Sequence, residues 1–172
     1  MTRRGRLTTP TIRLALPYRP SEDLTTFIYS ELEAALGEDI DIVLEVEQDR
    51  GAIEDLSPYV LILGPLAYVG KILLDTAIQK SVEHGARRFA ALMRRLRQGD
   101  DDRKDRDVHF GDTDRDVVFI LDQHTLEDPR SVPEMARVDT SMFPPYTQLR
   151  WDEHVGCWRL PSTPVSHGEL FG

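Results

Sequence analysis

The stretch YVLILGPLAYVGKILL, residues 59–74, constrains the fold more than any other part of this chain. It is too apolar for a surface element, yet Gly64, Pro65, Gly70 and Lys71 interrupt it. A charge near the centre of an isolated membrane span costs roughly 2.5–3.5 kcal/mol. We therefore expect the stretch to form a buried helix that packs across one face of a sheet. Contact with a membrane is the alternative.

The apolar spacing continues beyond this stretch into a basic segment. From Val69 onward, apolar residues recur largely at intervals of three, four or seven positions: Val69, Ile72, Leu73, Ile78, Val82, Ala86, Phe89, Met93 and Leu96. This spacing predicts one helix of about seven turns with a single buried face. Gly99 is expected to end it.

A strand, a helix and a second strand are predicted before the apolar stretch. Residues 12–16 alternate between apolar and other side chains, as in a half-buried strand. Ser21 is a suitable N-cap for a helix that Gly37 ends, and residues 40–47 alternate again. The three segments together predict a βαβ unit, or its split form with a strand inserted between the pair.

Two hairpins are predicted in the second half of the chain. A charged linker, residues 99–107, precedes a hairpin over 108–121, and a second hairpin covers 148–160. Between the hairpins the chain is mostly polar, and we expect a short helix near residues 132–138.

These elements predict one α+β fold. Its core is a mostly antiparallel sheet covered by two helices, with a split βαβ (ferredoxin-like) arrangement and a C-terminal β-hairpin. We expect a flexible basic tail over residues 1–10, an α+β domain over 11–139, and a C-terminal extension over 140–172 that contains hairpin 148–160 and a flexible tail.

Charge and cysteine content exclude several classes of protein. The formal net charge of −9 argues against a general nucleic-acid binder. Cys157 is the only cysteine, so neither an internal disulfide framework nor a cysteine-rich metal site can form. No apolar run of signal-peptide length follows the basic N-terminus, and we therefore expect a cytoplasmic protein.

The sequence nominates no catalytic, cofactor or metal-binding residue. Asp112, Asp114 and Asp116 have the spacing that begins a calcium loop, but the glycine and the closing glutamate of that motif are missing. His154 and Cys157 fall at a predicted hairpin tip and in its outgoing strand, which is poor geometry for a nucleophile and its base. A hydrolase assembled from scattered Asp and His side chains is an alternative that only convergent geometry would support.

Nine residues are candidates for contact with a partner or a membrane. They are Leu66, Val69 and Leu73 in the apolar segment, Arg87, Arg88, Arg94 and Arg95 on the basic face, and Trp151 and Trp158 in the second hairpin. Each group also has a structural interpretation. The leucines and the valine would be core, the arginines would be solvated near a helix C-terminus, and the tryptophans would pair across the hairpin and pack on the core.

The chain resembles the effector-associated constant component family of actinobacterial conflict systems. The resemblance is carried by IRLAL, LTTFIYSELEAALG, LGPLAYVGKILL leading to RRLRQ, and VVFILDQHTLEDP after a charged turn. It covers about residues 11–135 and leaves out 140–172. The resemblance implies a non-catalytic accessory or adaptor that accompanies effectors and proteases in defence-type operons. It transfers no catalytic residue.

These observations lead to one expected function and one alternative. We expect a non-catalytic protein–protein interaction or regulatory module that binds a protein partner. A homo-oligomer is also compatible with the sequence. The alternative is a membrane-associating effector or anchor that uses residues 59–96. No cofactor is expected.

Overall fold

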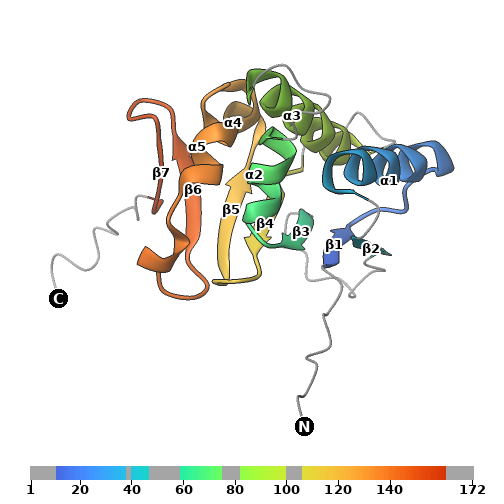
Figure 1. Ribbon diagram of the computed structural model, residues 1–172, viewed down its shortest axis with the longest axis horizontal. Coiled ribbons are helices and arrows are strands. Elements are labelled where there is room, and N and C mark those ends of the chain that lie inside the picture. The colour runs from blue at the N-terminus through green and yellow to red at the C-terminus, as the bar shows by residue number, and fades with distance from the viewer. Residues whose placement is uncertain (1–10, 38–39, 47–58, 75–81, 100–105, 162–172) are drawn as a thin grey trace, which may run out of the picture.

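A computed structural model describes residues 11–37, 40–46, 59–74, 82–99 and 106–161 of the chain (Figure 1). Seven strands belong to one sheet: β1 Thr11–Leu16, β2 Asp41–Val46, β3 Val60–Gly64, β4 Val108–Asp112, β5 Val117–Leu121, β6 Gln148–Asp152 and β7 Cys157–Arg159. The helices of the described residues are α1 Glu22–Leu36, α2 Ala67–Leu74, α3 Val82–Gln98, α4 Gln123–Glu127 and α5 Ser131–Arg137, with a 3₁₀ turn, η1, at Thr140–Met142.

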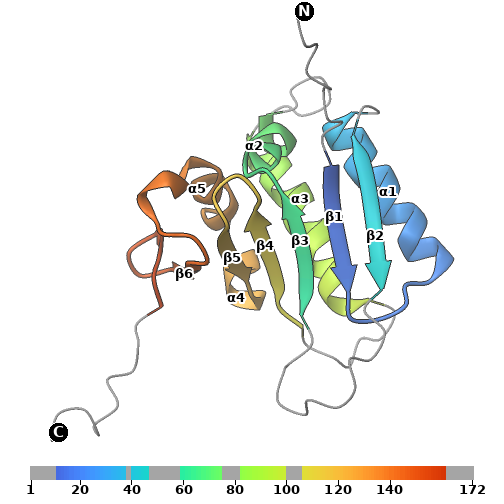
Figure 2. The ribbon, with the colours of Figure 1, turned by 90° about the horizontal axis from the view of Figure 1, so that it is seen from below.

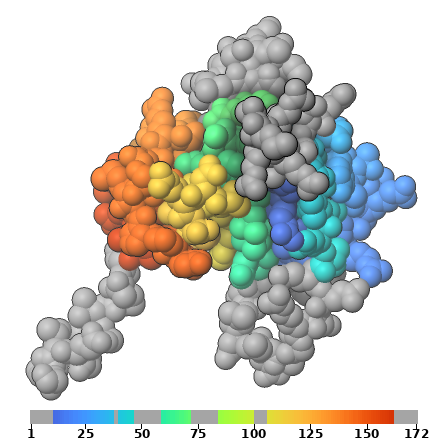
Figure 3. Space-filling view, turned by 60° about the horizontal axis from the view of Figure 1, so that its bottom comes forward, coloured from blue at the N-terminus to red at the C-terminus, as the bar shows by residue number. Residues whose placement is uncertain are grey.

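The strand order is β2-β1-β3-β4-β5-β6-β7. Neighbours β1–β2, β3–β4 and β5–β6 are parallel, whereas β1–β3, β4–β5 and β6–β7 are antiparallel. The fold therefore combines α and β elements as expected, but the sheet is mixed and not mostly antiparallel. Because β1 and β2 are direct parallel neighbours, their βαβ unit is not split by an inserted strand. The space-filling view shows β1, β2 and α1 at one end of the molecule and the last strands at the other (Figure 3).

The helices lie together on one side of the sheet, as two views at right angles show (Figures 1 and 2). Five side chains that neighbour one another across the sheet point into this layer and are buried: Leu14, Ile62, Phe110, Phe119 and Leu149. They form one hydrophobic core with side chains of the five helices, including Leu24, Val69, Phe89, Leu126 and Met135. In the described residues, five helices contribute to this layer where two were predicted.

The apolar stretch is a strand followed by a helix. Val60–Gly64 forms β3 between β1 and β4, and Pro65 begins the turn into α2. The backbone carbonyl of Pro65 accepts a hydrogen bond from the Tyr68 N–H at 2.9 Å, which starts the helix. Proline is tolerated there because the first N–H groups of a helix have no intrahelical partner. The prediction of a buried helix over the whole stretch is thus wrong for its first half.

The predicted seven-turn helix is also interrupted. Helix α2 ends at Leu74 and α3 begins at Val82, and the two helices pack against each other, which parts of one straight helix cannot do. Ile78, which the periodicity placed on the buried face, lies outside the described residues. In the part of the chain that the structure describes, no helix combines the length and the apolarity needed to cross a bilayer.

The hairpin predictions are confirmed by the strand pairing. Strands β4 and β5 are joined by a turn over residues 113–116, and β6 and β7 by a turn over 153–156. Strand β6 also pairs with β5, so the C-terminal hairpin continues the same sheet. The short helix predicted near residues 132–138 is α5, while α4 was not predicted.

Candidate functional site

A groove of about 500 Å³ lies between α3 and the connection from α4 to α5. Its floor is apolar and consists of Ala86 and Ala90 on α3, Leu126 on α4 and Val132 on α5, all of which are buried. Alanines four positions apart share one face of a helix, so this face of α3 leaves room for another group to approach closely. Figure 1 shows α4 beside α3 at this end of the sheet.

Charged side chains surround the floor of the groove. Arg87 and Arg94 come from α3, while Glu127, Asp128 and Arg130 come from the opposite wall. The Arg94 guanidinium donates a hydrogen bond to the Leu126 backbone carbonyl at 2.9 Å, which joins the two walls. Arg87 is exposed, and no hydrogen bond or ion pair of its side chain is found among the described residues. Among the residues that the structure describes, the rim therefore carries one cation that forms no ion pair and one whose hydrogen bond goes to a neutral carbonyl.

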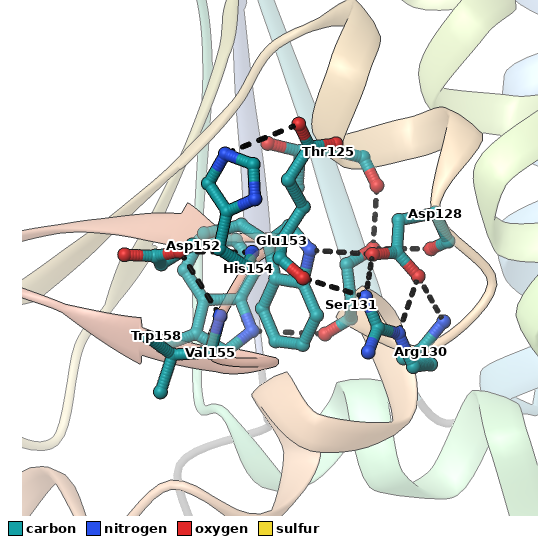
Figure 4. A network of polar contacts seen from close by, with 10 residues as sticks. Thr125, Asp128, Arg130, Ser131, Asp152, Glu153, His154, Val155 and Trp158 are labelled. Carbon is teal, nitrogen blue, oxygen red and sulfur yellow. Dashed lines mark hydrogen bonds and ion pairs between the residues drawn. The ribbon is translucent and has the colours of Figure 1, made fainter.

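The far wall of the groove is held by a polar network around Asp128 (Figure 4). The Asp128 carboxylate accepts hydrogen bonds from the Arg130 backbone N–H at 3.0 Å and from its guanidinium at 2.8 and 3.1 Å. It also accepts one from the Trp151 indole N–H at 2.9 Å. The Arg130 guanidinium donates onward to the Glu153 backbone carbonyl at 2.9 Å. The α4–α5 connection is thereby tied to the β6–β7 hairpin.

A second set of contacts anchors the start of α5 to the same hairpin. The Ser131 hydroxyl donates to the carbonyls of Thr125 at 2.6 Å and Asp128 at 2.9 Å. The carbonyl of Ser131 accepts a hydrogen bond from the Trp158 indole N–H at 2.8 Å. These hydrogen bonds join α4, α5, β6 and β7. The wall of the groove is therefore positioned by the sheet and not only by the loop that forms it.

We expect these contacts to make stability depend on pH through Asp128. Hydrogen bonds from Arg130, followed by those from Trp151 and the charge of Arg130, hold the pKa of the Asp128 carboxyl well below its usual range, although partial burial opposes them. A group with a depressed pKa stabilises the fold fully above its unfolded pKa and loses this contribution as the pH falls toward the folded pKa. Below about pH 4, wild type should therefore lose stability more steeply than Asp128→Asn. Urea unfolding at a series of pH values measures the difference, and parallel curves for the two proteins would contradict it.

The residues of the apolar segment and of the basic face that were predicted to contact a partner do not come together at one site in the structure. Leu66 and Val69 are buried in the core of this chain. Leu73 lies in α2, and its side chain is outside what the structure describes. The Arg88 guanidinium donates to the Glu31 carboxylate on α1 at 2.8 Å, and Arg95 donates to the Gly99 carbonyl at 2.8 Å. Of the four arginines, only Arg87 and Arg94 line the groove.

The two tryptophans face each other across the hairpin, in register. Their ring centroids are 5.8 Å apart, and Trp158 also meets Phe119 edge-to-face at 5.1 Å. Trp158 is 6% exposed and belongs to the core, while Trp151 is half-buried above the Asp128 network. Both contribute to the groove indirectly, by holding its wall.

The acidic turn has a structural role in the described fold. One oxygen of the buried Asp112 carboxylate accepts hydrogen bonds from the N–H groups of Leu66 at 3.1 Å and Asp114 at 3.2 Å. The other accepts from the Thr140 hydroxyl at 2.9 Å. Within the described ranges, no three His, Cys, Asp or Glu side chains are grouped so that they could hold a metal ion. His154 lies on the exposed hairpin turn and is 4.0 Å from the Glu153 carboxylate.

Sequence reasoning missed the groove itself. The apolar spacing predicts that Ala86 lies on the buried face of its helix, but it predicts no site at Leu126 or Val132 on the opposite wall. The only local signal is the pair Ala86 and Ala90 beside Arg87 and Arg94, that is, small side chains next to long cations on one helix. Comparison of the chain with protein-family models, curated proteins and solved structures finds no match.

Proposed function

We propose that this protein is a non-catalytic interaction module that binds a segment of a partner protein in the groove between α3 and the α4–α5 connection. The observation that carries the proposal is the combination of a buried apolar floor with a rim of charged side chains. Protein interfaces combine an apolar centre with a polar rim, and arginine is enriched in them. The resemblance to accessory components of bacterial conflict systems supports the same kind of role.

The construction of the groove also supports binding without a large rearrangement. One wall is a helix of 17 residues, and the other is attached to the sheet through Asp128, Ser131 and the two tryptophans. A preformed site avoids the free-energy cost of ordering its walls when the partner arrives. The fixed walls therefore favour the groove as a binding site over the exposed turns of the molecule.

Charge reversal on the rim tests the proposal. We expect Arg87→Glu to weaken capture of the native partner by roughly tenfold, since repulsion replaces attraction at the edge of a partly desolvated contact. Folding should be unaffected because the Arg87 side chain makes no hydrogen bond or ion pair with the described residues. Arg19→Glu is the matched control, as Arg19 is exposed and does not line the groove.

The measurement is quantitative co-purification of tagged full-length protein from its source cells, scored by mass spectrometry. The proposal predicts a set of proteins captured by wild type and Arg19→Glu and depleted with Arg87→Glu. Equal capture by all three would count against the groove, and the melting temperature of each variant checks that the fold is kept.

A further inference from the structure

We infer that the groove takes an acidic peptide segment that places an apolar side chain on Ala86 and Ala90 and carboxylates beside Arg87 and Arg94. The inference rests on the proposed function and specifies the chemistry of the partner. Three features favour a polypeptide as the occupant: the charge of the rim, the spacing of its two arginines and the apolar floor of the groove.

The charged residues at the rim of the groove indicate the sign of the charge that the occupant should carry. Asp128 and Arg130 neutralise each other through their two guanidinium hydrogen bonds, so the pair adds no net charge. The remaining charged residues of the lining are Arg87, Arg94 and Glu127, which sum to +1 (two cations minus one anion). The chain as a whole has a formal charge of −9. The groove is thus a locally positive site on an acidic protein, and it complements an acidic partner.

The two cations of α3 have hydrogen-bonding capacity left for such a partner. A guanidinium carries five N–H donors in a planar fork that matches a carboxylate. In the described residues, the guanidinium of Arg94 donates to a single carbonyl and that of Arg87 makes no hydrogen bond or ion pair. Both side chains therefore retain donors suited to carboxylate oxygens.

The spacing of the cations favours an elongated occupant. Arg87 and Arg94 are seven residues apart on one helix, which separates their Cα atoms by roughly 10 Å along the axis. Acidic side chains about three residues apart on an extended segment span a similar distance, so each arginine can pair with its own carboxylate. The occupant should therefore carry at least two carboxylates on one chain.

The apolar floor of the groove indicates that the occupant also carries an apolar side chain. Buried Ala86, Ala90, Leu126 and Val132 present apolar surface at the base of a volume of about 500 Å³. Because each of these four residues is at most 6% exposed, the apolar surface left at the base is small, and we expect it to receive one side chain of the segment. An apolar side chain gains most there because apolar surface leaves water on both partners.

Peptide selection against the full-length protein tests the inference. A random peptide library displayed on phage is selected on wild type, and the recovered peptides are synthesised and measured by fluorescence anisotropy. We expect peptides with paired Asp or Glu around an apolar residue. Their affinity should fall roughly tenfold with Arg87→Glu, and also as salt is raised, because exposed charge pairs are screened. Arg19→Glu should bind them like wild type.

The outcomes separate this inference from the proposed function. The selection could instead recover basic or uncharged peptides whose binding is lost in Ala86→Gln, a variant with an unchanged melting temperature. That result would overturn the acidic character of the occupant but would keep the groove as a binding site. Recovery of no peptides, or of peptides that bind wild type, Arg87→Glu and Ala86→Gln equally, would overturn both. Competition by a small dicarboxylate such as glutarate as strong as that of the peptides would overturn the choice of a polypeptide occupant.

Discussion

Replacement of Trp158 by alanine is expected to lower the free energy of unfolding by about 3–5 kcal/mol, the range typical of truncating a buried aromatic. Trp158 is 6% exposed and packs edge-to-face on Phe119 at a centroid distance of 5.1 Å. Its indole N–H donates to the Ser131 carbonyl at 2.8 Å. The substitution therefore opens a cavity between β7 and the core and removes the indole hydrogen bond to the first residue of α5. Equilibrium unfolding in urea measures the loss.

A conservative variant separates packing from hydrogen bonding at the same position. Trp158→Phe keeps most of the buried apolar surface but removes the donor to Ser131, so we expect a smaller loss of about 1–3 kcal/mol. If Trp158→Ala cost no more than Trp158→Phe, the ring would not be packed on the core. The C-terminal hairpin would then contribute little to the stability of the groove wall.

Replacement of Gly99 by alanine is expected to destabilise the protein by about 1–3 kcal/mol. Gly99 ends α3 with a φ of +59°, a region that a residue with a Cβ rarely adopts. An added Cβ would lie only 3.0 Å from the ring of Tyr18. That ring is fixed because its hydroxyl donates to the Leu96 carbonyl at 2.7 Å and the Arg106 guanidinium stacks 4.7 Å from its centroid. The end of the helix therefore has no room to adjust.

The same substitution at Gly70 is a matched control with the opposite expected sign. Gly70 lies within α2, and an added Cβ would meet nothing within 4 Å. Alanine is a better helix former than glycine by roughly 0.5–1 kcal/mol, so Gly70→Ala should raise stability. Thermal and urea unfolding of the two variants measure both effects. Destabilisation of similar size at both positions would contradict the difference in free space around the two glycines.

The elements with a clear local signal were predictable from the sequence. Ser21 and Gly37 bound α1 because a side-chain oxygen caps the first turn and glycine ends the last, and the alternating strands β1 and β2 flank it. Both hairpins were predicted because apolar runs flank short polar turns. These features depend on residues close together in the chain, which is why a single sequence reveals them.

The error at β3 has a physical cause. Val60–Leu63 is a continuous apolar run, although in the fold its residues alternate between buried and half-buried. Without alternation of apolar and polar residues, the sequence pattern of such a strand cannot be distinguished from that of a buried helix. The mixed strand order could not be predicted either, because it depends on which distant segments pair. Recognising that Gly64 and Pro65 separate two elements, as they do between β3 and α2, would have corrected the first error but not the second.

The candidate site was predicted only on one wall. Arg87 and Arg94 were identified as a basic face, but their neighbours Arg88 and Arg95 are engaged by Glu31 and the Gly99 carbonyl. The packing of α1 and the end of α3 decide which arginines remain available. The order of charges along one helix gives no information about either. The groove exists only because α4 and α5, about 40 residues further along, pack against α3.

Site-specific photo-crosslinking tests whether this groove binds a partner protein. A photoreactive phenylalanine derivative is placed at position 87 on the rim or at position 19 away from it, and the full-length protein is irradiated in its source cells. We expect a discrete crosslinked partner from position 87 that is absent from position 19. No crosslink from position 87, or the same crosslinks from both positions, would contradict it.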